Sequence, residues 1–297
     1  MKVIAIDLDG TLLSENLSIH EKDVCAIKEA QKQDYIVAIA TGRALFDAQH
    51  IAKKHDLDCP IIASNGAQIY VDYKKIDEQF IKQSIVQAII PWLNEREMYY
   101  QAYLSDKIVV SNLGINYLEK QLHDVMEQNS DFNLDEFWKG IKAQIYQYGL
   151  EEKTGTILPT DYHSIIKIMV VSPNVHLLKE VKAHFQQITG CEISSSGTFN
   201  LEIMSTGVDK GITLRKLCNY YETSVENAVA IGDNLNDMPM FQVAATGIAM
   251  GNADKELVRV STYQTLSNQE CGVAYAFEKY IKANKVEDQD VEEEKLV

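Results

Sequence analysis

The chain has 297 residues, of which 46% are hydrophobic and 24% charged, a composition typical of a folded globular protein long enough for two domains. Its 43 acidic and 28 basic side chains give a formal net charge of −15, which repels nucleic acid and anionic membranes, so we expect neither as a partner. An anionic ligand therefore needs a local metal ion, a Lys or Arg side chain, or a helix N-terminus.

The first 80 or so residues alternate short apolar runs with amphipathic stretches, which is the pattern of a βαβαβ unit. Strands are predicted at Val3–Ile6, Tyr35–Ala40 and Pro60–Ala63, and helices at about 21–33 and 44–56. The pattern returns near residue 210, with a helix through Leu214 and Leu217, the strand Ala228–Ile231, a helix near 237–243 and the strand Gly247–Met250. Because one parallel sheet can hold both stretches, we expect a doubly wound, Rossmann-like α/β domain from residues 1–82 and 206–284.

Residues 83–205 follow a different pattern, which predicts an inserted α+β domain. Helices are expected through Ile85–Leu93, Leu118–Val125 and, behind Asn174, Leu178–Phe185, and strands at Ile165–Val171 and near 191–195 and 200–204. The stretch 130–160 has no clear periodicity. The last thirteen residues, 285–297, hold six acids and two lysines, and we expect this acidic tail to be disordered.

The five cysteines are widely spaced and form no Cys-x-x-Cys pair, which predicts reduced thiols and argues against a disulfide framework or a thiolate zinc site. The N-terminus carries no signal-peptide pattern, and no apolar stretch approaches the roughly 18 residues of a membrane span. We therefore expect a soluble cytoplasmic protein, whose oligomeric state the sequence does not indicate.

Two acids stand at the end of the first predicted strand, in Asp7-Leu8-Asp9-Gly10-Thr11. Strand side chains repeat every two residues, so Asp7 and Asp9 start on the same side. The end of a parallel strand is also where open α/β sheets bind ligands. The alternative is a polar turn that only ends the strand.

More acids follow a later strand, in Gly232-Asp233-Asn234-Leu235-Asn236-Asp237. If the two strand ends lie side by side, they supply the hard oxygen ligands that Mg²⁺ prefers: Asp7, Asp9, Asp233 and Asp237. The alternative makes position 233 or 234 only a helix cap. A cap would account for one acid but not for four acids at two strand ends.

Two further segments open predicted helices. Thr41-Gly42-Arg43 follows the strand Tyr35–Ala40 and offers a hydroxyl and unpaired N–H groups to an anion. Asp209-Lys210-Gly211 places an ammonium where a phosphate oxygen could lie. Each segment alone indicates little, since an isolated Lys is usually solvated surface.

Taken in order, Asp-x-Asp-Gly-Thr, Thr-Gly-Arg, Asp-Lys-Gly and Gly-Asp-x-x-Asn-Asp resemble the four motifs of the haloacid dehalogenase superfamily, in particular its Cof-type phosphatases. The resemblance extends from residue 1 to about 283 and includes Ser64-Asn65-Gly66-Ala67 and Leu201-Glu202-Ile203. The long stretch between the second motif and Lys210 resembles the C2 cap architecture, most like its B form. The resemblance therefore implies a catalytic core with residues 83–205 as its cap.

The resemblance further implies a Mg²⁺-dependent hydrolase of a small phosphate monoester, such as a sugar phosphate or a related metabolite. Asp7 would be the nucleophile that forms an aspartyl-phosphate, and Asp9 the general acid and base. Mg²⁺ would be held by the Asp7 side chain, the backbone carbonyl of Asp9 and Asp233, with Asp237 nearby. The residues that would hold the phosphoryl oxygens are Thr41, Gly42, Lys210 and Asn236.

Two other functions stay open. A signalling module would accept phosphate on Asp7 with a related sheet and Mg²⁺, although Asp9 and the large insert count against it. A phosphotransferase or mutase would need an acceptor that outcompetes water. In the insert, two Trp and seven Tyr side chains could stack on the leaving group or fill the core of the cap.

Overall fold

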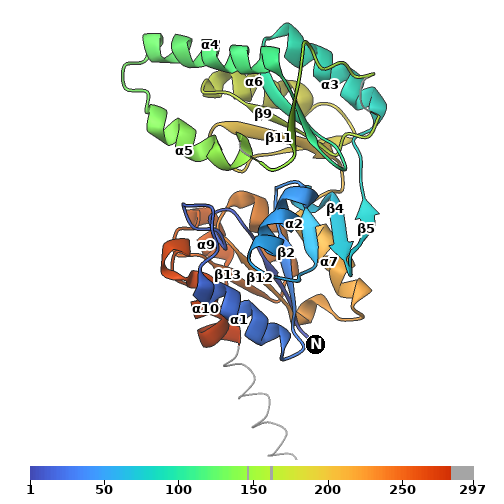
Figure 1. Cartoon of the computed structure of the whole chain (residues 1–297), viewed down its shortest axis with the longest axis vertical. Coiled ribbons are helices and arrows are strands. Elements are labelled where there is room, and N and C mark those ends of the chain that lie inside the picture. Colours follow the sequence, from blue (N-terminus) through green and yellow to red (C-terminus); the bar gives the residue numbers. More distant parts are fainter. Residues whose placement is uncertain (146, 161–162, 282–297) are drawn as a thin grey trace, which may run out of the picture. The chain divides into compact units, whose positions relative to one another are not determined.

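A computed structural model describes residues 1–145, 147–160 and 163–281 (Figure 1). The chain separates into two compact units: unit 1 holds residues 1–41, 52–60 and those from 210 on, and unit 2 holds residues 42–51 and 61–209. Within the described ranges, every helix is too short or too polar to cross a membrane. The acidic tail predicted at 285–297 lies outside the described residues.

Unit 1 is built on strands in the order β14-β13-β12-β1-β2, each parallel to its neighbours. Their bounds are Val3–Ile6 (β1), Ile36–Ala40 (β2), Ala228–Gly232 (β12), Thr246–Ala249 (β13) and Tyr263–Gln264 (β14). All residues of β1 and β12 are buried, because helices cover both faces. Strands buried on both faces give continuous apolar runs rather than an alternating pattern.

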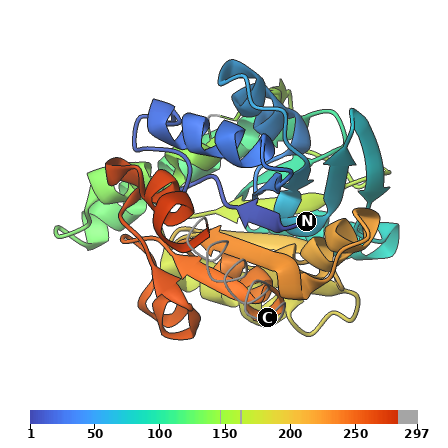
Figure 2. The same cartoon turned by 90° about the horizontal axis from the view of Figure 1, so that it is seen from below.

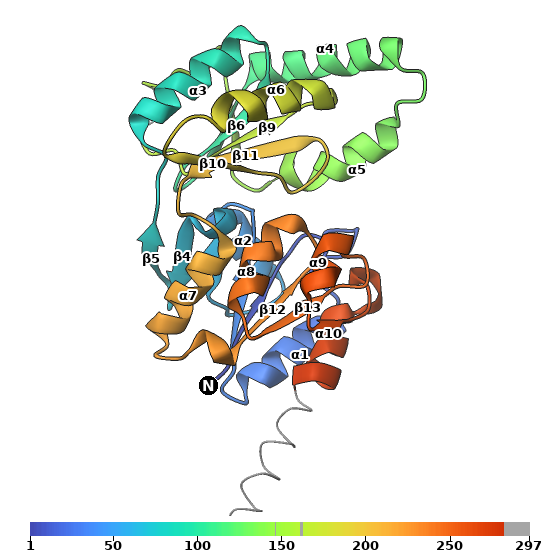
Figure 3. The same ribbon diagram turned by 180° about the vertical axis from the view of Figure 1, so that it is seen from behind.

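The helices of unit 1 flank these strands. They are Glu21–Gln31 (α1), Lys210–Tyr220 (α7), Met238–Val243 (α8), Lys255–Val260 (α9) and Gly272–Ala276 (α10), with short 3-10 turns at Val225–Asn227, Leu235–Asp237 and Asn268–Glu270 and a π-turn at Phe277–Ile281. α1 lies beside α10, whereas α7 and α8 lie on the opposite side of the strands (Figures 2 and 3). Pro239 stands in the first turn of α8, as its fixed φ predicts.

Unit 2 contains a six-stranded sheet in the order β10-β11-β9-β6-β7-β8, antiparallel except between β7 and β8. The bounds are Tyr99–Tyr103 (β6), Ile108–Ser111 (β7), Leu150–Lys153 (β8), Lys167–Val171 (β9), Cys191–Ser194 (β10) and Asn200–Ser205 (β11). One face packs against Gln83–Glu95 (α3) and Val175–Phe185 (α6), and the other against Asn112–Gln128 (α4) and Leu134–Ile145 (α5).

Unit 2 also includes most of α2 (Leu45–Lys54), the strands β3 (Ile61–Ala63), β4 (Gln68–Val71) and β5 (Lys74–Glu78), and the 3-10 turn Ser64–Gly66. These segments group with residues 83–205 and share hydrogen bonds with them, such as that from Ser105 Oγ to Glu78 Oε1 of β5 at 2.6 Å. The bounds of the two compact units differ from the domain bounds predicted from the sequence. They nearly agree at one place, where unit 2 ends at residue 209 and the inserted domain is predicted to end at 205.

The strands and helices predicted from periodicity are present within a few residues of their expected bounds. The stretch 130–160, which has no clear sequence period, contains α5 and β8. Among the aromatic side chains of the insert, Tyr99, Tyr100 and Tyr103 are buried in the core, whereas Trp138 and Tyr148 are exposed. Tyr146 and Tyr162 lie outside the described residues.

Candidate active site

The register of the parallel strands brings three motifs of unit 1 to one edge. Asp7 directly follows β1 and Asp233 directly follows β12, with Ile6 opposite Ile231. The Asp7 amide continues this pairing by donating to the Ile231 carbonyl at 3.0 Å. Thr41 directly follows β2, the other neighbour of β1. Residues that are remote in the sequence therefore meet at the carboxyl ends of adjacent strands, where open α/β sheets bind ligands.

Three carboxylates converge at this edge. Asp7, Asp233 and Asp237 each offer an oxygen that lies within 4.8 Å of the other two. The first residue of α7, Lys210, is fully buried between two of them. Its ammonium donates to Asp7 Oδ1 at 2.7 Å and to Asp237 Oδ1 at 2.6 Å. The alternative of a solvated surface lysine is therefore wrong, and a polar turn does not describe a buried Asp7.

The helix-cap alternative holds for part of the second motif. The Asn234 side chain caps the turn Leu235–Asp237 and forms a capping box with Asp237, whose Oδ2 accepts from the amides of residues 233 and 234 at 2.9 and 3.1 Å. The Asp233 carboxylate instead accepts a hydrogen bond from Thr11 Oγ1 at 2.9 Å. Capping therefore fixes the turn and leaves the Asp233 carboxylate in the acidic cluster.

Burial and mutual repulsion shift the pKa values of the charged groups in the cluster. Burial raises the pKa of Asp7 from 3.8 to about 8; Lys210 opposes this rise, while Asp237 and Asp9 add to it. Burial, with repulsion from Asp7 and Asp237, likewise raises the pKa of Asp233 well above its ordinary value. Burial alone would lower the pKa of Lys210, but attraction by the two acids that it contacts raises it.

The donor set fits a small divalent cation. Three ionised carboxylates beside one ammonium leave two negative charges uncompensated, which a divalent ion would neutralise. All three donors are hard oxygens, the ligand type of Mg²⁺. Such an ion would also favour the ionised form of the acids and so oppose the rise of their pKa values by burial and mutual repulsion.

For the remaining predicted site residues the structure gives burial and location. Asp9 is half-buried and its charge acts on Asp7, Thr41 is fully buried, and Asn236 is half-buried in the turn that precedes α8. Gly42 belongs to unit 2. The sequence analysis gave no role to Thr11, although Thr11 belongs to the first motif. Its hydroxyl, two residues after Asp9, was the feature that could have indicated one.

Gly10 stands beside the cluster in a left-handed conformation, with φ of +83°, and a Cβ there would collide with the Asp233 carboxylate. We therefore expect Gly10→Ala to displace Asp233 and to lower kcat/KM by at least about tenfold. The reason is that a hydrogen bond to a charged group contributes about 1.5–3 kcal/mol. The control is Gly207→Ala, because Gly207 has φ of +75° with open space around it. This control should lose only about 1–2 kcal/mol of stability from backbone strain. Equal activity of the two variants would contradict this role of Gly10.

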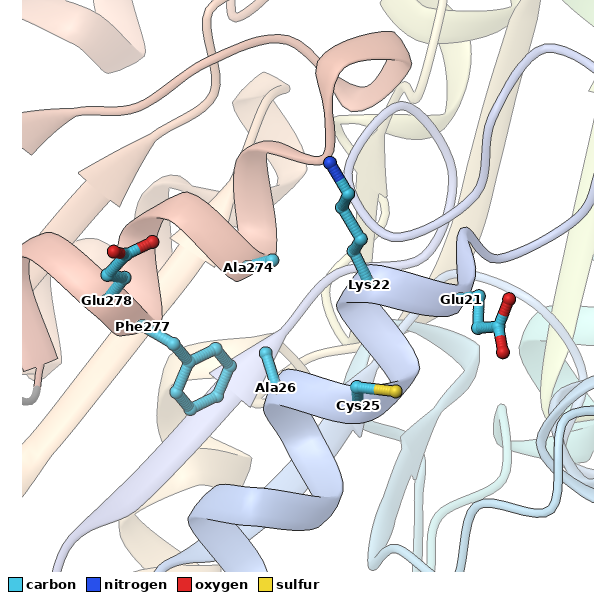
Figure 4. Close-up of a pocket in the computed structure, with 7 residues that line it drawn as sticks. All are labelled: Glu21, Lys22, Cys25, Ala26, Ala274, Phe277 and Glu278. Carbon is cyan, nitrogen blue, oxygen red and sulfur yellow. The ribbon is translucent and has the colours of Figure 1, made fainter.

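A groove of about 570 Å³ lies elsewhere in unit 1, between α1 and the C-terminal helices (Figure 4). Its lining residues are Glu21, Lys22, Cys25, Ala26, Ala274, Phe277 and Glu278. The Phe277 ring lies toward Ala26, and the charged lining residues are Glu21, Lys22 and Glu278. None of the predicted site residues lines this groove, which is therefore separate from the acidic cluster.

Comparisons with known proteins identify the family of the chain. A family model described as haloacid dehalogenase-like hydrolase matches residues 4–277. The chain is 35% identical over 283 residues to 5-amino-6-(5-phospho-D-ribitylamino)uracil phosphatase YwtE of Bacillus subtilis, covering 95% of this chain and 98% of that protein. It is 28% identical to pyridoxal phosphate phosphatase YbhA of Escherichia coli, covering 85% and 89% of the two chains.

Solved structures show the same fold. A haloacid dehalogenase-like hydrolase from B. subtilis superposes with a TM-score of 0.82 at 27% identity, over 94% of this chain and all of that one. A subclass IIB sugar phosphatase of the superfamily gives a TM-score of 0.74 at 20% identity, over 94% and 99% of the two chains. The resemblance found in the motifs is thereby confirmed, and the chain belongs to the haloacid dehalogenase-like hydrolase family as a phosphatase.

Proposed function

We propose that the protein is a Mg²⁺-dependent phosphomonoesterase that acts on a small phosphorylated metabolite through an aspartyl-phosphate on Asp7. The observation that carries the proposal is the convergence of Asp7, Asp233 and Asp237 around the buried Lys210 ammonium. Phosphoryl transfer depends mainly on positioning and on neutralised charge. This arrangement would supply both with Mg²⁺ bound.

In the first step an Asp7 carboxylate oxygen attacks phosphorus in line with the ester oxygen. The phosphorus–ester bond breaks, and Asp9 gives its proton to the leaving oxygen. In the second step Asp9, now ionised, takes a proton from water, whose oxygen attacks the same phosphorus. The bond to Asp7 then breaks, which releases inorganic phosphate and restores both acids. Lys210 holds the Asp7 carboxylate for both steps through its 2.7 Å hydrogen bond.

The metal would be held by the Asp7 and Asp233 carboxylates and the Asp9 backbone carbonyl, with Asp237 nearby. When bound, Mg²⁺ supplies positive charge for the phosphoryl oxygens. For those oxygens we propose four further contacts: Thr41, Gly42, Lys210 and Asn236. Thr41 is supported by its place at the end of β2, beside the strand that carries Asp7.

Removal of the metal is expected to abolish hydrolysis of p-nitrophenyl phosphate, and added Mg²⁺ to restore it. Without the ion, the uncompensated negative charge of the cluster repels the phosphate dianion. Turnover after exhaustive EDTA treatment is the measurement, with Ca²⁺ as the control ion because its longer bonds and flexible coordination do not match octahedral Mg²⁺. Full activity in EDTA would contradict the proposal.

The substrate is proposed from the relatives. YwtE is named for a phosphorylated ribitylaminouracil and YbhA for pyridoxal phosphate. A panel of these two compounds and common sugar phosphates, scored by release of inorganic phosphate, would identify the preferred ester. We propose that residues 83–205, as the cap of a core formed by 1–82 and 206–284, determine this preference.

Product analysis with added sugar acceptors would distinguish hydrolysis from phosphotransfer, and a phosphoaspartate that persists without turnover would favour a signalling role.

A further inference from the structure

We propose that Lys167, with Glu202 and Asn65, is a positioning group that fixes the Gly42 peptide for phosphate binding. The inference rests on the proposed function, because it deepens the role given there to the segment that follows Thr41. All the groups involved belong to unit 2.

Lys167 is the first residue of β9 and is 1% exposed. Its ammonium donates to the Gly42 carbonyl at 2.5 Å and to Glu202 Oε1 at 2.9 Å, and it lies 4.2 Å above the centre of the Tyr103 ring. Tyr103 is its direct partner on β6, and Glu202 extends from β11, the other neighbour of β9. Residues of three adjacent strands therefore surround the buried Lys167 ammonium, which donates to the backbone of Gly42.

Asn65 completes the contact from a second direction. It is 3% exposed and has a left-handed backbone, with φ of 55° and ψ of 28°. Its side-chain amide donates to the second carboxylate oxygen of Glu202. A Cβ at Gly42 would stand 3.0 Å from Asn65 Oδ1, so only glycine fits without displacing this side chain. Lys167 thus holds the Gly42 carbonyl, and Asn65 occupies the space that a side chain at position 42 would need.

The next peptides are fixed as well. The Ser64 amide donates to the Arg43 carbonyl at 2.8 Å, and the Ala44 amide donates to Gln147 Oε1 at 3.4 Å. Because a peptide is planar, holding the Gly42 carbonyl also sets the direction of the Arg43 N–H at the start of α2. Backbone N–H groups at helix starts bind anions, so their directions determine phosphate affinity.

A structural role explains the Lys167–Glu202 pair poorly. Both side chains are almost fully buried, and a buried ion pair is often no more stabilising than apolar side chains of similar size. Removing one partner leaves an unpaired buried charge, which by itself is strongly destabilising. A test must therefore remove both charges together.

The double variant Lys167→Met/Glu202→Gln removes the contact to Gly42 and leaves no unpaired charge. We expect the dissociation constant of inorganic phosphate, measured by calorimetry in Mg²⁺, to rise about tenfold or more, as for loss of one charged hydrogen bond. KM for p-nitrophenyl phosphate should rise in proportion, with a smaller change in kcat. The melting midpoint should stay within about 4 °C of the wild-type value.

The matched control is Lys107→Met/Glu151→Gln, which removes an exposed pair with a 3.0 Å contact beside the same sheet. Its phosphate affinity should equal that of the wild type. Should the first double variant fail to fold, Asn65→Gly keeps the left-handed backbone, leaves the ion pair intact and should weaken phosphate binding in the same direction.

Unchanged phosphate affinity in the folded variants would overturn the inference, as would a wild type that binds no phosphate. A lower melting midpoint with unchanged affinity would show a purely structural role. A wild type that binds phosphate without hydrolysing any ester would refute the proposed function alone.

Discussion

Asp7→Asn is expected to lower kcat by a factor on the order of 10⁴ or more, as removal of a catalytic nucleophile does in other enzymes. The amide keeps the shape of the side chain but cannot form the acyl-phosphate. Hydrolysis of p-nitrophenyl phosphate in saturating Mg²⁺ is the measurement.

Asp23→Asn is the matched control, because Asp23 is a buried acid of unit 1 that accepts a hydrogen bond from the Ala274 amide at 2.7 Å, away from the cluster. Its activity should stay near that of the wild type. Equal rates for Asp7→Asn and wild type would exclude Asp7 as the nucleophile.

Asp7→Asn should also change how the free energy of unfolding of the metal-free protein depends on pH. The pKa of Asp7 is about 8 in the folded state against the ordinary 3.8, so the folded state keeps a proton that the unfolded chain loses. The free energy of unfolding therefore falls as pH rises through this window. The other charged groups here are Asp9, Lys210, Asp233 and Asp237; Asp233 shifts in the same direction. Asp7→Asn should flatten part of the fall in urea unfolding at pH 5, 7 and 9 with EDTA, and an unchanged slope would contradict this assignment.

Lys210→Met is expected to produce the largest loss of stability, about 3–5 kcal/mol, because it leaves buried carboxylates without their cation. The lost contacts are the hydrogen bonds to Asp7 and Asp237 at 2.7 and 2.6 Å. Hydrolysis should also fall, since the ammonium no longer orients the nucleophile. Urea unfolding at pH 7 with EDTA measures the first effect, and turnover in Mg²⁺ the second.

Arg215→Met on the same helix is the control, because Arg215 is exposed. Surface substitutions of this kind usually change stability by no more than about 0.5 kcal/mol. If Lys210→Met were as stable and active as Arg215→Met, the buried ion-pair network would have no role in folding or catalysis.

The parallel strands of unit 1 were predictable because they are buried on both faces and give short apolar runs such as Ala228–Ile231. Asp7 and Asp233 could be placed together for a related reason: each follows such a run, and parallel strands end at one edge. The helix of α5 escaped detection because residues 130–160 show no clear apolar period, although Phe137 and Ile141 are fully buried.

The contacts around Gly42 could not be predicted from local pattern. Lys167 lies 125 residues from Gly42 in the chain and 35 from Glu202. A lysine at the start of an apolar strand usually keeps its ammonium in solvent, whereas Lys167 is buried among three paired strands. Contacts that depend on strand order become visible only when the sheet is assembled.

Anomalous diffraction from crystals grown with Mn²⁺ in place of Mg²⁺ would test most directly whether the cluster holds a metal ion. We expect one strong peak within about 2.5 Å of carboxylate oxygens of both Asp7 and Asp233, with the Asp9 carbonyl as a further ligand. A peak elsewhere, with these two carboxylates bound to no ion, would contradict the metal site on which the proposed mechanism depends.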